Sequence, residues 1–405
     1  MNFFHLITQL ETGFLIQDFA VVMIVAAIMV FVTHKLKQPM VIGYILAGML
    51  IGPFTPPFSL VHNVGTINTL AELGIIILLF VIGTEFPITK LKSVGRISMI
   101  VGIAESVGTL LVTFFVARTL GFSQFDSVFL ALAMSVTSTV VTVKLLEELN
   151  MINDKSSVLI MGILIVEDVI VITMLGILQS LSLTAAVSFV DVLLSVAIVL
   201  GFIAAILILG SRYLPPLIDK LARTTDYSVL IIVILGLAFG LSFVAIELGL
   251  SPVIGAFLAG VLVAESNSAG IARVITIPLR DVFTALFFVS VGALVDVSKI
   301  PLFIIPALIL IVTSFMAKMI IIIPVLIRAG YDTTTAVRTG LGLASARGEM
   351  SLIVGKGGQD VGAVSSYILP ILGVVTIVTT FVTPYILKIG TKLNISSSPS
   401  EENKS

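Results

Sequence analysis

The chain has 405 residues, of which 58% are hydrophobic and 11% are charged, and its formal net charge is −1. Soluble domains usually carry about a quarter charged residues, so this composition excludes an ordinary water-soluble protein and indicates a chain that lies in a lipid bilayer. The small net charge provides no basic surface for nucleic acid. Because the chain has no cysteine, disulfide bonds and thiolate metal sites are excluded as well.

Apolar stretches, separated by proline, glycine and charged clusters, follow one another along almost the whole chain. Many exceed the ~18 to 20 residues that cross a hydrocarbon core of ~30 Å. We predict thirteen transmembrane segments, at 17–33, 39–53, 69–86, 97–118, 126–148, 157–180, 189–210, 227–249, 252–265, 279–295, 301–328, 336–358 and 363–389. The fold class is therefore an all-α polytopic membrane protein, with a membrane domain at 1–392 and a disordered cytoplasmic tail at 393–405.

Basic residues gather on one side of the predicted helices. Loops after odd-numbered segments hold 17 of the 22 Lys and Arg residues, and the opposite loops hold only Arg118, Lys299 and Lys356. Since Lys and Arg accumulate in cytoplasmic loops, this asymmetry predicts a cell-membrane protein with its N-terminus outside and its C-terminus in the cytoplasm. The remaining two, Lys318 and Arg347, fall inside predicted segments.

One short sequence recurs in the two halves of the chain. VIGYILAGML at 41–50 and VIGAFLAGVL at 253–262 are identical at seven of ten positions. The copies are seven predicted helices apart, an odd number, so they enter the membrane from opposite sides. Such inverted repeats, here roughly 39–180 and 252–389, are typical of secondary transporters, whose binding site lies near mid-membrane between the repeats.

Glu167, Asp168 and Lys318 lie deep inside predicted membrane segments, where each is a functional candidate because a charge there is costly. Glu167 and Asp168 are about eleven residues, or ~16 Å, from either end of their segment. Adjacent helical residues do not face each other, so the two carboxylates can hold different partners. Lys318 lies too deep to reach water easily and needs a carboxylate, with Glu167 or Asp168 as the natural partner. A purely structural ion pair is the alternative.

Two further segments have features of interrupted helices. Arg347 and Glu349 stand among glycines in the middle of the twelfth segment. Its counterpart in the first repeat is SVTST, whose Thr137, Ser138 and Thr139 offer hydroxyl oxygens and carbonyls freed from the helix. Two crossed, partly unwound helices would direct their ends at one ion site, with Arg347 and Glu349 offsetting the helix dipoles. The alternative is an intact helix in which the hydroxyls bond to the preceding turn.

Carboxylates, hydroxyls and carbonyls are the oxygen ligands that hard cations prefer, and this inventory suits Na⁺, Li⁺ or K⁺. Burial disfavours a charged carboxylate, so a proton and a cation compete for Asp168, and competition at one site is sufficient for exchange. Other membrane acids are less informative: Glu72, Glu85 and Glu247 lie near predicted ends, Glu72 being a candidate for an outer funnel, and Glu105 is deeper but lone.

Six motifs carry a family resemblance: PMVIGYILAG at 39–48, ELGIIILLFVIGTE at 72–85, SVTST at 135–139, ED at 167–168, FFVSVG at 287–292 and RGE at 347–349. In them the chain resembles the monovalent cation:proton antiporter-2 family over residues 15–390. That family includes bacterial sodium/proton exchangers and the membrane part of glutathione-regulated potassium efflux systems. The resemblance implies a dimerisation or panel domain, a six-helix core with two crossed helices, elevator-like alternating access and a homodimer.

The same resemblance assigns roles to the buried charges. Asp168 corresponds to the family's essential ion-binding aspartate, and Glu167 to the preceding position, which varies between acid and amide. Lys318 resembles the membrane lysine that pairs with that preceding acid in electrogenic exchangers. The pair here is Glu-Asp instead of Asp-Asp, which leaves the proton stoichiometry open. The potassium-efflux branch usually carries a cytoplasmic nucleotide-binding domain, which this sequence lacks, and this favours sodium.

We therefore predict an antiporter that exchanges Na⁺ or Li⁺ for H⁺ across the cell membrane, without a cofactor. A K⁺/H⁺ antiporter of the potassium-efflux type is one alternative. A cation channel is the alternative from another class, although a midplane Glu-Asp-Lys cluster would hold an ion better than pass it. We expect no enzymatic activity, because HExxH, GxSxG and phosphate-loop motifs are missing and GLGL at 340–343 lacks the aspartate of an intramembrane protease.

Overall fold

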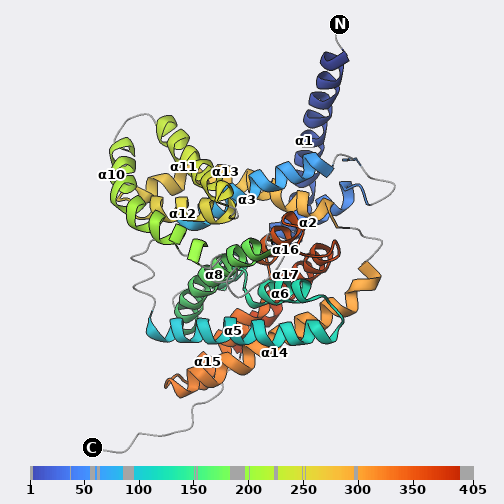
Figure 1. Ribbon diagram of the computed structural model, residues 1–405. Coiled ribbons are helices and arrows are strands. Elements are labelled where there is room, and N and C mark those ends of the chain that lie inside the picture. The colour runs from blue at the N-terminus through green and yellow to red at the C-terminus, as the bar shows by residue number, and fades with distance from the viewer. Residues whose placement is uncertain are drawn as a thin grey trace, which may run out of the picture. The chain divides into compact units, whose positions relative to one another are not determined.

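The computed structural model is helical throughout the residues that it describes, and the order of the helices can be followed in Figure 1. It describes residues 3–36, 38–54, 60–61, 64–84, 95–149, 151, 154–182, 197–199, 201–222, 227–248, 250, 252–295 and 300–392. The predicted tail at 393–405 and the start of the predicted segment 189–210 lie outside these residues.

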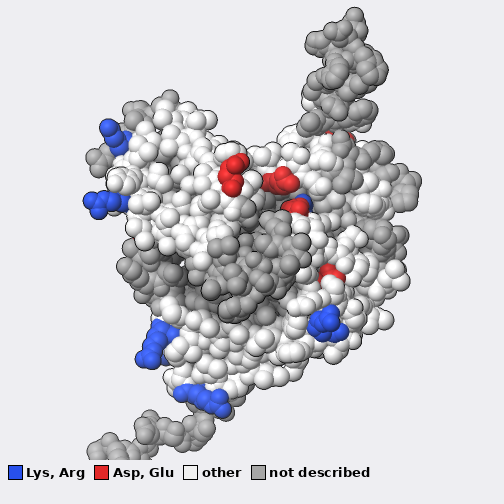
Figure 2. Space-filling view, in the orientation of Figure 1, with Lys and Arg blue, Asp and Glu red and all other residues white. Residues whose placement is uncertain are grey.

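Nine of the described helices are long and apolar enough to cross a bilayer, and Met40–Ile51 and Pro252–Ala264 are shorter apolar helices. Charged residues are sparse on the face drawn in Figure 2. Large apolar side chains such as Phe115, Ile232 and Leu302 are more than half exposed, an arrangement that suits lipid tails better than water. The chain is thus a multi-pass membrane protein, whereas the total of thirteen helices and the sidedness stay predictions.

The chain divides into two compact units, each built from distant parts of the sequence. The first unit comprises Met1–Ser93, Ile172–Phe303 and Lys356–Gly373, and the second comprises Val94–Val171, Ile304–Gly355 and Val374–Ser405. Two of the unit boundaries fall inside the long helices α8 (Lys155–Ser182) and α17 (Ile368–Lys392).

The first unit holds most of the N-terminal and central helices. They are α1 (Phe3–Lys35), α2 (Met40–Ile51), α3 (Val64–Thr84), the π-helical turn η1 (Ile206–Gly210), α10 (Ser211–Ala222), α11 (Tyr227–Glu247), α12 (Pro252–Ala264) and α13 (Ala269–Ala293). Helix α12 packs against both α3 and α11, and α13 packs against α2 and α3 (Figure 1).

Glycines of the repeated sequence let helices of the first unit pack backbone against backbone. A Cβ on Gly48 of α2 would lie 2.0 Å from the carbonyl oxygen of Val289 in α13. A Cβ on Gly260 of α12 would lie 2.0 Å from the carbonyl oxygen of Phe80 in α3. Gly48 and Gly260 occupy the same position in the two copies of the repeat, so the two helix contacts are counterparts. The inverted repeat itself stays a prediction.

The second unit carries the predicted site residues. Its helices are α5 (Arg96–Thr119), α6 (Gln124–Ser135), α7 (Thr139–Glu148), the first part of α8, most of α14 (Ile300–Arg328), α15 (Thr333–Ser345), the start of α16 (Glu349–Asp360) and most of α17. Apolar residues of α5, α8, α14 and α15 form a shared buried cluster, which includes Val101, Ile163, Ile322 and Leu343. Packing of these four helices fixes the positions of the polar side chains that they carry.

Two helix starts differ from the prediction by ten residues or more. Helix α13 begins at Ala269 and not at 279, so Pro278, at which the predicted segment is divided from the preceding one, lies inside it. The physical reason is that the helix accommodates its arginines: Arg273 Nη2 donates a 2.7 Å hydrogen bond to the carbonyl oxygen of Thr84, at the end of α3, where carbonyls lack helical partners. Helix α1 likewise begins at Phe3 and not at 17.

Candidate ion-binding site

Two interrupted helices meet in the second unit. One break, at 136–138, separates α6 from α7, and the other, at 346–348, separates α15 from α16. Both open with the same extended backbone, at φ −92° and ψ 145° for Val136 and φ −93° and ψ 130° for Ala346. The backbone N–H of Ser138 donates a 3.0 Å hydrogen bond to the carbonyl oxygen of Ala346. The predicted pair of partly unwound helices is thereby confirmed, and the intact-helix alternative is wrong.

The hydroxyls around the first break have different kinds of partner. Ser135 Oγ donates to the carbonyl oxygen of Leu132 in its own helix, as back-bonding requires. The next three hydroxyls leave their own helix: Thr137 Oγ1 is 2.6 Å from Leu343 O, Ser138 Oγ is 2.7 Å from Glu349 Oε2, and Thr139 Oγ1 is 3.0 Å from Asp168 Oδ2. The three predicted hydroxyl residues therefore contact the predicted charged residues or the opposite break.

Gly348 allows the two breaks to approach each other closely. A Cβ on this residue would lie 2.4 Å from the hydroxyl oxygen of Ser138. Any larger residue would push Ser138 away from Glu349, so glycine is needed here for its small size. The glycine in the RGE motif thus explains how two unwound segments share one place.

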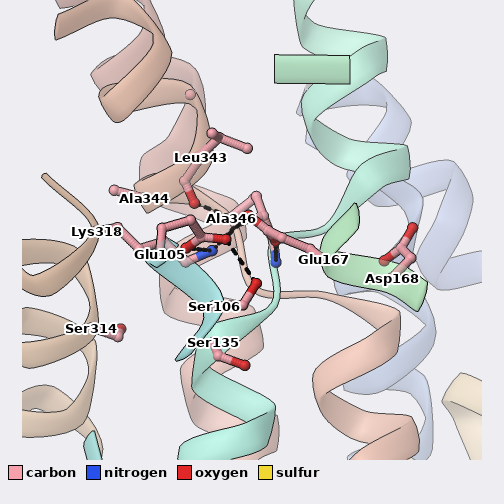
Figure 3. Close-up of polar contacts among 12 residues, drawn as sticks. Glu105, Ser106, Ser135, Glu167, Asp168, Ser314, Lys318, Leu343, Ala344 and Ala346 are labelled. Atoms are coloured by element: carbon pink, nitrogen blue, oxygen red, sulfur yellow. Dashed lines mark hydrogen bonds and ion pairs between the residues drawn. The ribbon is translucent and has the colours of Figure 1, made fainter. Parts of the chain in front are cut away.

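Lys318, on α14, inserts its ammonium group into a buried cluster of acceptors. Its Nζ donates to Thr137 Oγ1 at 2.8 Å and to Glu167 Oε1 at 2.9 Å, and it lies 3.1 Å from Glu105 Oε2. The side chains of Lys318, Glu105 and Glu167 are all 0% exposed. Figure 3 shows the two carboxyl groups and the ammonium pointing at one another. Three oxygen atoms thus surround the Lys318 ammonium, which has three N–H donors.

Glu167 is the partner of Lys318, which decides between the two candidates that the sequence left open. Besides the ammonium, Glu167 accepts a 2.6 Å hydrogen bond from the backbone N–H of Thr137 through Oε2. Thr137 lies in the first break, where its N–H has left the helical ladder. The interrupted helix therefore supplies a donor that stabilises a charged carboxylate.

Asp168 turns to another side of α8. Figure 3 shows its side chain leaving the helix away from the Lys318 cluster, as expected for adjacent helical residues. It is 1% exposed, and Thr139 Oγ1 donates to its Oδ2. Thr139 is the first residue of α7, so this carboxylate lies at the positive end of a helix dipole. The carboxylates of Glu167 and Asp168 therefore have separate partners.

Arg347 and Glu349 lie at the two helix ends of the second break. The Arg347 guanidinium donates from Nη1 to the carbonyl oxygens of Ala344 and Ala346, both at 3.3 Å, and from Nη2 to Ser314 Oγ at 3.2 Å. A cation thus contacts the carboxyl end of α15. Glu349 is the first residue of α16, so an acid lies at that helix's amino end. This placement agrees with dipole compensation, and the functional role of both residues stays a proposal.

Glu105 is the site residue that sequence reasoning missed. The sequence offered no partner for it, because Lys318 is 213 positions away along the chain. The structure corrects the view that this acid is lone. A local signal existed: Glu105, Thr109 and Thr113 recur every four residues in an apolar helix and are all fully buried, which is the spacing of one helix face.

Comparisons with known proteins decide which family this arrangement belongs to. The family model for the transmembrane sodium/hydrogen exchanger matches residues 20–392. The chain belongs to this family. The resemblance to monovalent cation:proton antiporters, which rested on six motifs, is confirmed by that match.

Two curated bacterial proteins are similar to this chain over most of its length. The putative cation/proton antiporter YbaL of Escherichia coli is 33% identical over 68% of this chain and 50% of its own length. The iron transporter MagA of Paramagnetospirillum magneticum is 31% identical over 87% of this chain and 80% of its own length. The chain thus spans half the length of YbaL. The first name states only a cation and the second states iron. Family membership alone therefore does not identify the transported ion.

A solved structure has the same fold. The sodium proton antiporter MjNhaP1 from Methanocaldococcus jannaschii superposes with a TM-score of 0.70, at 17% sequence identity, and the match covers 95% of this chain and 99% of that one. At such low identity the likeness establishes the fold of the exchanger family and leaves the chemistry to the residues of this chain.

Proposed function

We propose that the chain is a secondary antiporter that exchanges Na⁺ or Li⁺ for H⁺ across the cell membrane by alternating access. The observation that carries this proposal is the buried carboxylate of Asp168, which lies near the middle of α8 and accepts a hydrogen bond from Thr139 at the start of α7. Family membership and the names of relatives that move cations against protons support it.

Oxygen atoms around Asp168 supply a site for a hard monovalent cation. The carboxylate provides the charge, and the hydroxyl of Thr139, 3.0 Å from Oδ2, provides a neutral oxygen. Thr137 and Ser138 add backbone carbonyls at a break in the helix, where carbonyls are free to turn. Glu167 is the second proposed carboxylate ligand, and it reaches the cation only by leaving Lys318. Arg347 and Glu349 hold the ends of the second interrupted helix in place.

Exchange follows from the cost of a bare charge in a low-dielectric site. An unpaired carboxylate inside protein or lipid costs several kcal/mol, so the site crosses the membrane readily only when Asp168 carries a proton or a cation. Either ligand neutralises the carboxylate, and binding one removes the other. The empty site therefore does not move, and each crossing carries one of the two ions. This coupling separates an antiporter from a uniporter.

The test is exchange by purified protein in liposomes with an imposed pH gradient. Adding Na⁺, Li⁺ or K⁺ outside should dissipate the gradient with saturable kinetics for Na⁺ and Li⁺. Asp168→Asn keeps the size of the side chain and removes the charge, so we expect exchange to be lost. Asp281→Asn is the matched control, because Asp281 is 60% exposed and pairs with Arg280 on the surface; it should keep full exchange.

Three outcomes would change the proposal. Full exchange by Asp168→Asn would remove Asp168 as the carrier. A preference for K⁺ would move the chain to the K⁺/H⁺ alternative. Non-saturating cation flux without proton movement would favour a channel, because channels pass ions far faster than a site that must release each one.

The arrangement in the membrane is a separate part of the proposal. We expect the N-terminus outside, the C-terminus in the cytoplasm and a homodimer. Because the native chain has no cysteine, a single Ser397→Cys variant reports sidedness: an impermeant maleimide should label it in inside-out vesicles and not in intact cells. Labelling in intact cells would reverse the proposed orientation.

A further inference from the structure

Two carboxylates compete for one buried ammonium, and they are not equivalent. Glu167 accepts hydrogen bonds from Lys318 Nζ and from the backbone N–H of Thr137. Glu105 Oε2 forms an ion pair with the same Nζ at 3.1 Å, a longer contact than the 2.9 Å of Glu167. Its other oxygen, Oε1, accepts one bond from the hydroxyl of Ser106. Glu105 therefore already lies within reach of the ammonium and holds it less closely than Glu167 does.

We propose that Glu105 is the second partner of Lys318, to which the ammonium shifts when a cation takes Glu167. The inference rests on the proposed function, in which Glu167 contributes to the cation site. Lys318 Nζ is 2.9 Å from Glu167 Oε1 and 3.1 Å from Glu105 Oε2, so a change of partner requires only a small rotation of the lysine. Thr137 Oγ1, 2.8 Å from Nζ, keeps the ammonium in place during the change.

The reason for a second acid lies in the cost of a lone buried charge. Without Glu105, a cation that takes Glu167 would leave the Lys318 ammonium fully buried and without a carboxylate. Removing one member of a buried pair is strongly unfavourable, and that penalty would count against cation binding. With Glu105 in reach, Lys318 stays paired in both the empty and the loaded site. Glu105 thus acts through Lys318 as a positioning residue and does not touch the cation.

Other charged groups around the cluster do not replace it. Asp168 lies on another side of α8 (Figure 3) and is the proposed cation carrier. Arg347, at the second break, donates to backbone carbonyls and to Ser314 and is itself a cation. Glu349 is held against Ser138. Glu105 is the acid that the described residues place next to Lys318 besides Glu167.

The decisive variant is Glu105→Gln, which keeps shape and removes the charge. Exchange in liposomes gives KM and kcat for Na⁺, and thermal stabilisation by added Na⁺ gives the half-saturating concentration without turnover. We expect KM and the half-saturating concentration to rise about tenfold or more, with kcat at saturating Na⁺ within about threefold of wild type. Glu247→Gln, on an exposed acid of α11, is the matched control and should change neither.

A double-mutant cycle separates this role from a structural one. In a Lys318→Gln background there is no ammonium to receive, so adding Glu105→Gln should change the half-saturating concentration less than about twofold. Glu105→Leu is the second variant if Glu105→Gln does not fold, with the same expectation. A wild-type KM in both Glu105 variants would overturn the inference, as would an equal loss in the Lys318→Gln background.

The proposed function and this inference fail in distinguishable ways. If the wild type neither exchanges nor is stabilised by Na⁺, Li⁺ or K⁺, the proposed function is wrong and the inference falls with it. If the wild type and Glu247→Gln exchange normally while Glu105→Gln has an unchanged KM, only the inference is wrong.

Discussion

Replacing Lys318 with methionine tests how strongly the buried cluster depends on its single ammonium. The variant loses hydrogen bonds to Thr137 Oγ1 at 2.8 Å and Glu167 Oε1 at 2.9 Å, and the ion pair with Glu105. Hydrogen bonds to charged groups contribute about 1.5 to 3 kcal/mol each. The lysine no longer has to be desolvated, but two carboxyl groups lose their counter-charge. Breaking a buried pair in this way costs about 3–5 kcal/mol.

The measurement is the apparent melting temperature in detergent at pH 8. The chain has no tryptophan, so the fraction that remains monodisperse after heating is followed by size exclusion. A loss of this size should lower the midpoint by roughly 4–6 °C.

Lys388→Met is the matched control for the same chemical change on an exposed lysine of α17, where surface substitutions usually stay within about 0.5 kcal/mol. Combining Lys318→Met with Glu167→Gln should restore part of the midpoint, because one unpaired charge is removed. An unchanged midpoint for Lys318→Met would refute the reasoning that the ammonium stabilises the cluster.

Two predictions concern the packing and capping of single helices. Gly260→Ala should lower stability by about 1–3 kcal/mol, because its Cβ would lie 2.0 Å from the carbonyl oxygen of Phe80. The control is Gly236→Ala on α11, where a Cβ would meet nothing within 4 Å and should not be destabilising. Equal melting midpoints for the two variants would contradict the packing argument. Asp332→Ala should cost about 1 kcal/mol by removing the N-cap bond to the Thr335 N–H. Hydrogen bonds from Thr335 lower the pKa of Asp332. The contribution of Asp332 to the free energy of unfolding is therefore complete above ~pH 4 and is lost only as the pH falls through the lowered pKa. A stability loss of Asp332→Ala that varies between pH 5 and pH 8 would contradict this.

Local patterns in the sequence were sufficient for the helices and for much of the site. Glu167 and Asp168 stand out because acids are rare in the middle of an apolar segment, and the separate directions of their side chains follow from helix geometry alone. The breaks at 136–138 and 346–348 were predictable, because hydroxyl and glycine residues weaken a membrane helix where charges also occur. These features depend on residues close together in the chain, which a single sequence displays.

Features that depend on distant residues were harder to predict. Whether Lys318 pairs with Glu167 or Asp168 depends on how α14 packs against α8, and hydrophobic periodicity does not fix that rotation. Glu105 was missed for the same reason, since its partner lies on another helix. The start of α13 was misplaced because Arg273 finds a carbonyl at the end of α3, and that contact exists only in the folded chain.

The burial of Lys318 also explains why the site needs an interrupted helix. An intact helix would use the backbone N–H of Thr137 in its own ladder, and Glu167 would then have only the ammonium as a partner. The break releases that N–H, which reaches Glu167 Oε2 at 2.6 Å, so the carboxylate keeps a donor even when Lys318 moves away. Glu105 keeps an acceptor for the ammonium in the same event. Both halves of the ion pair thus have a second partner, which allows a buried pair to open without leaving either charge alone.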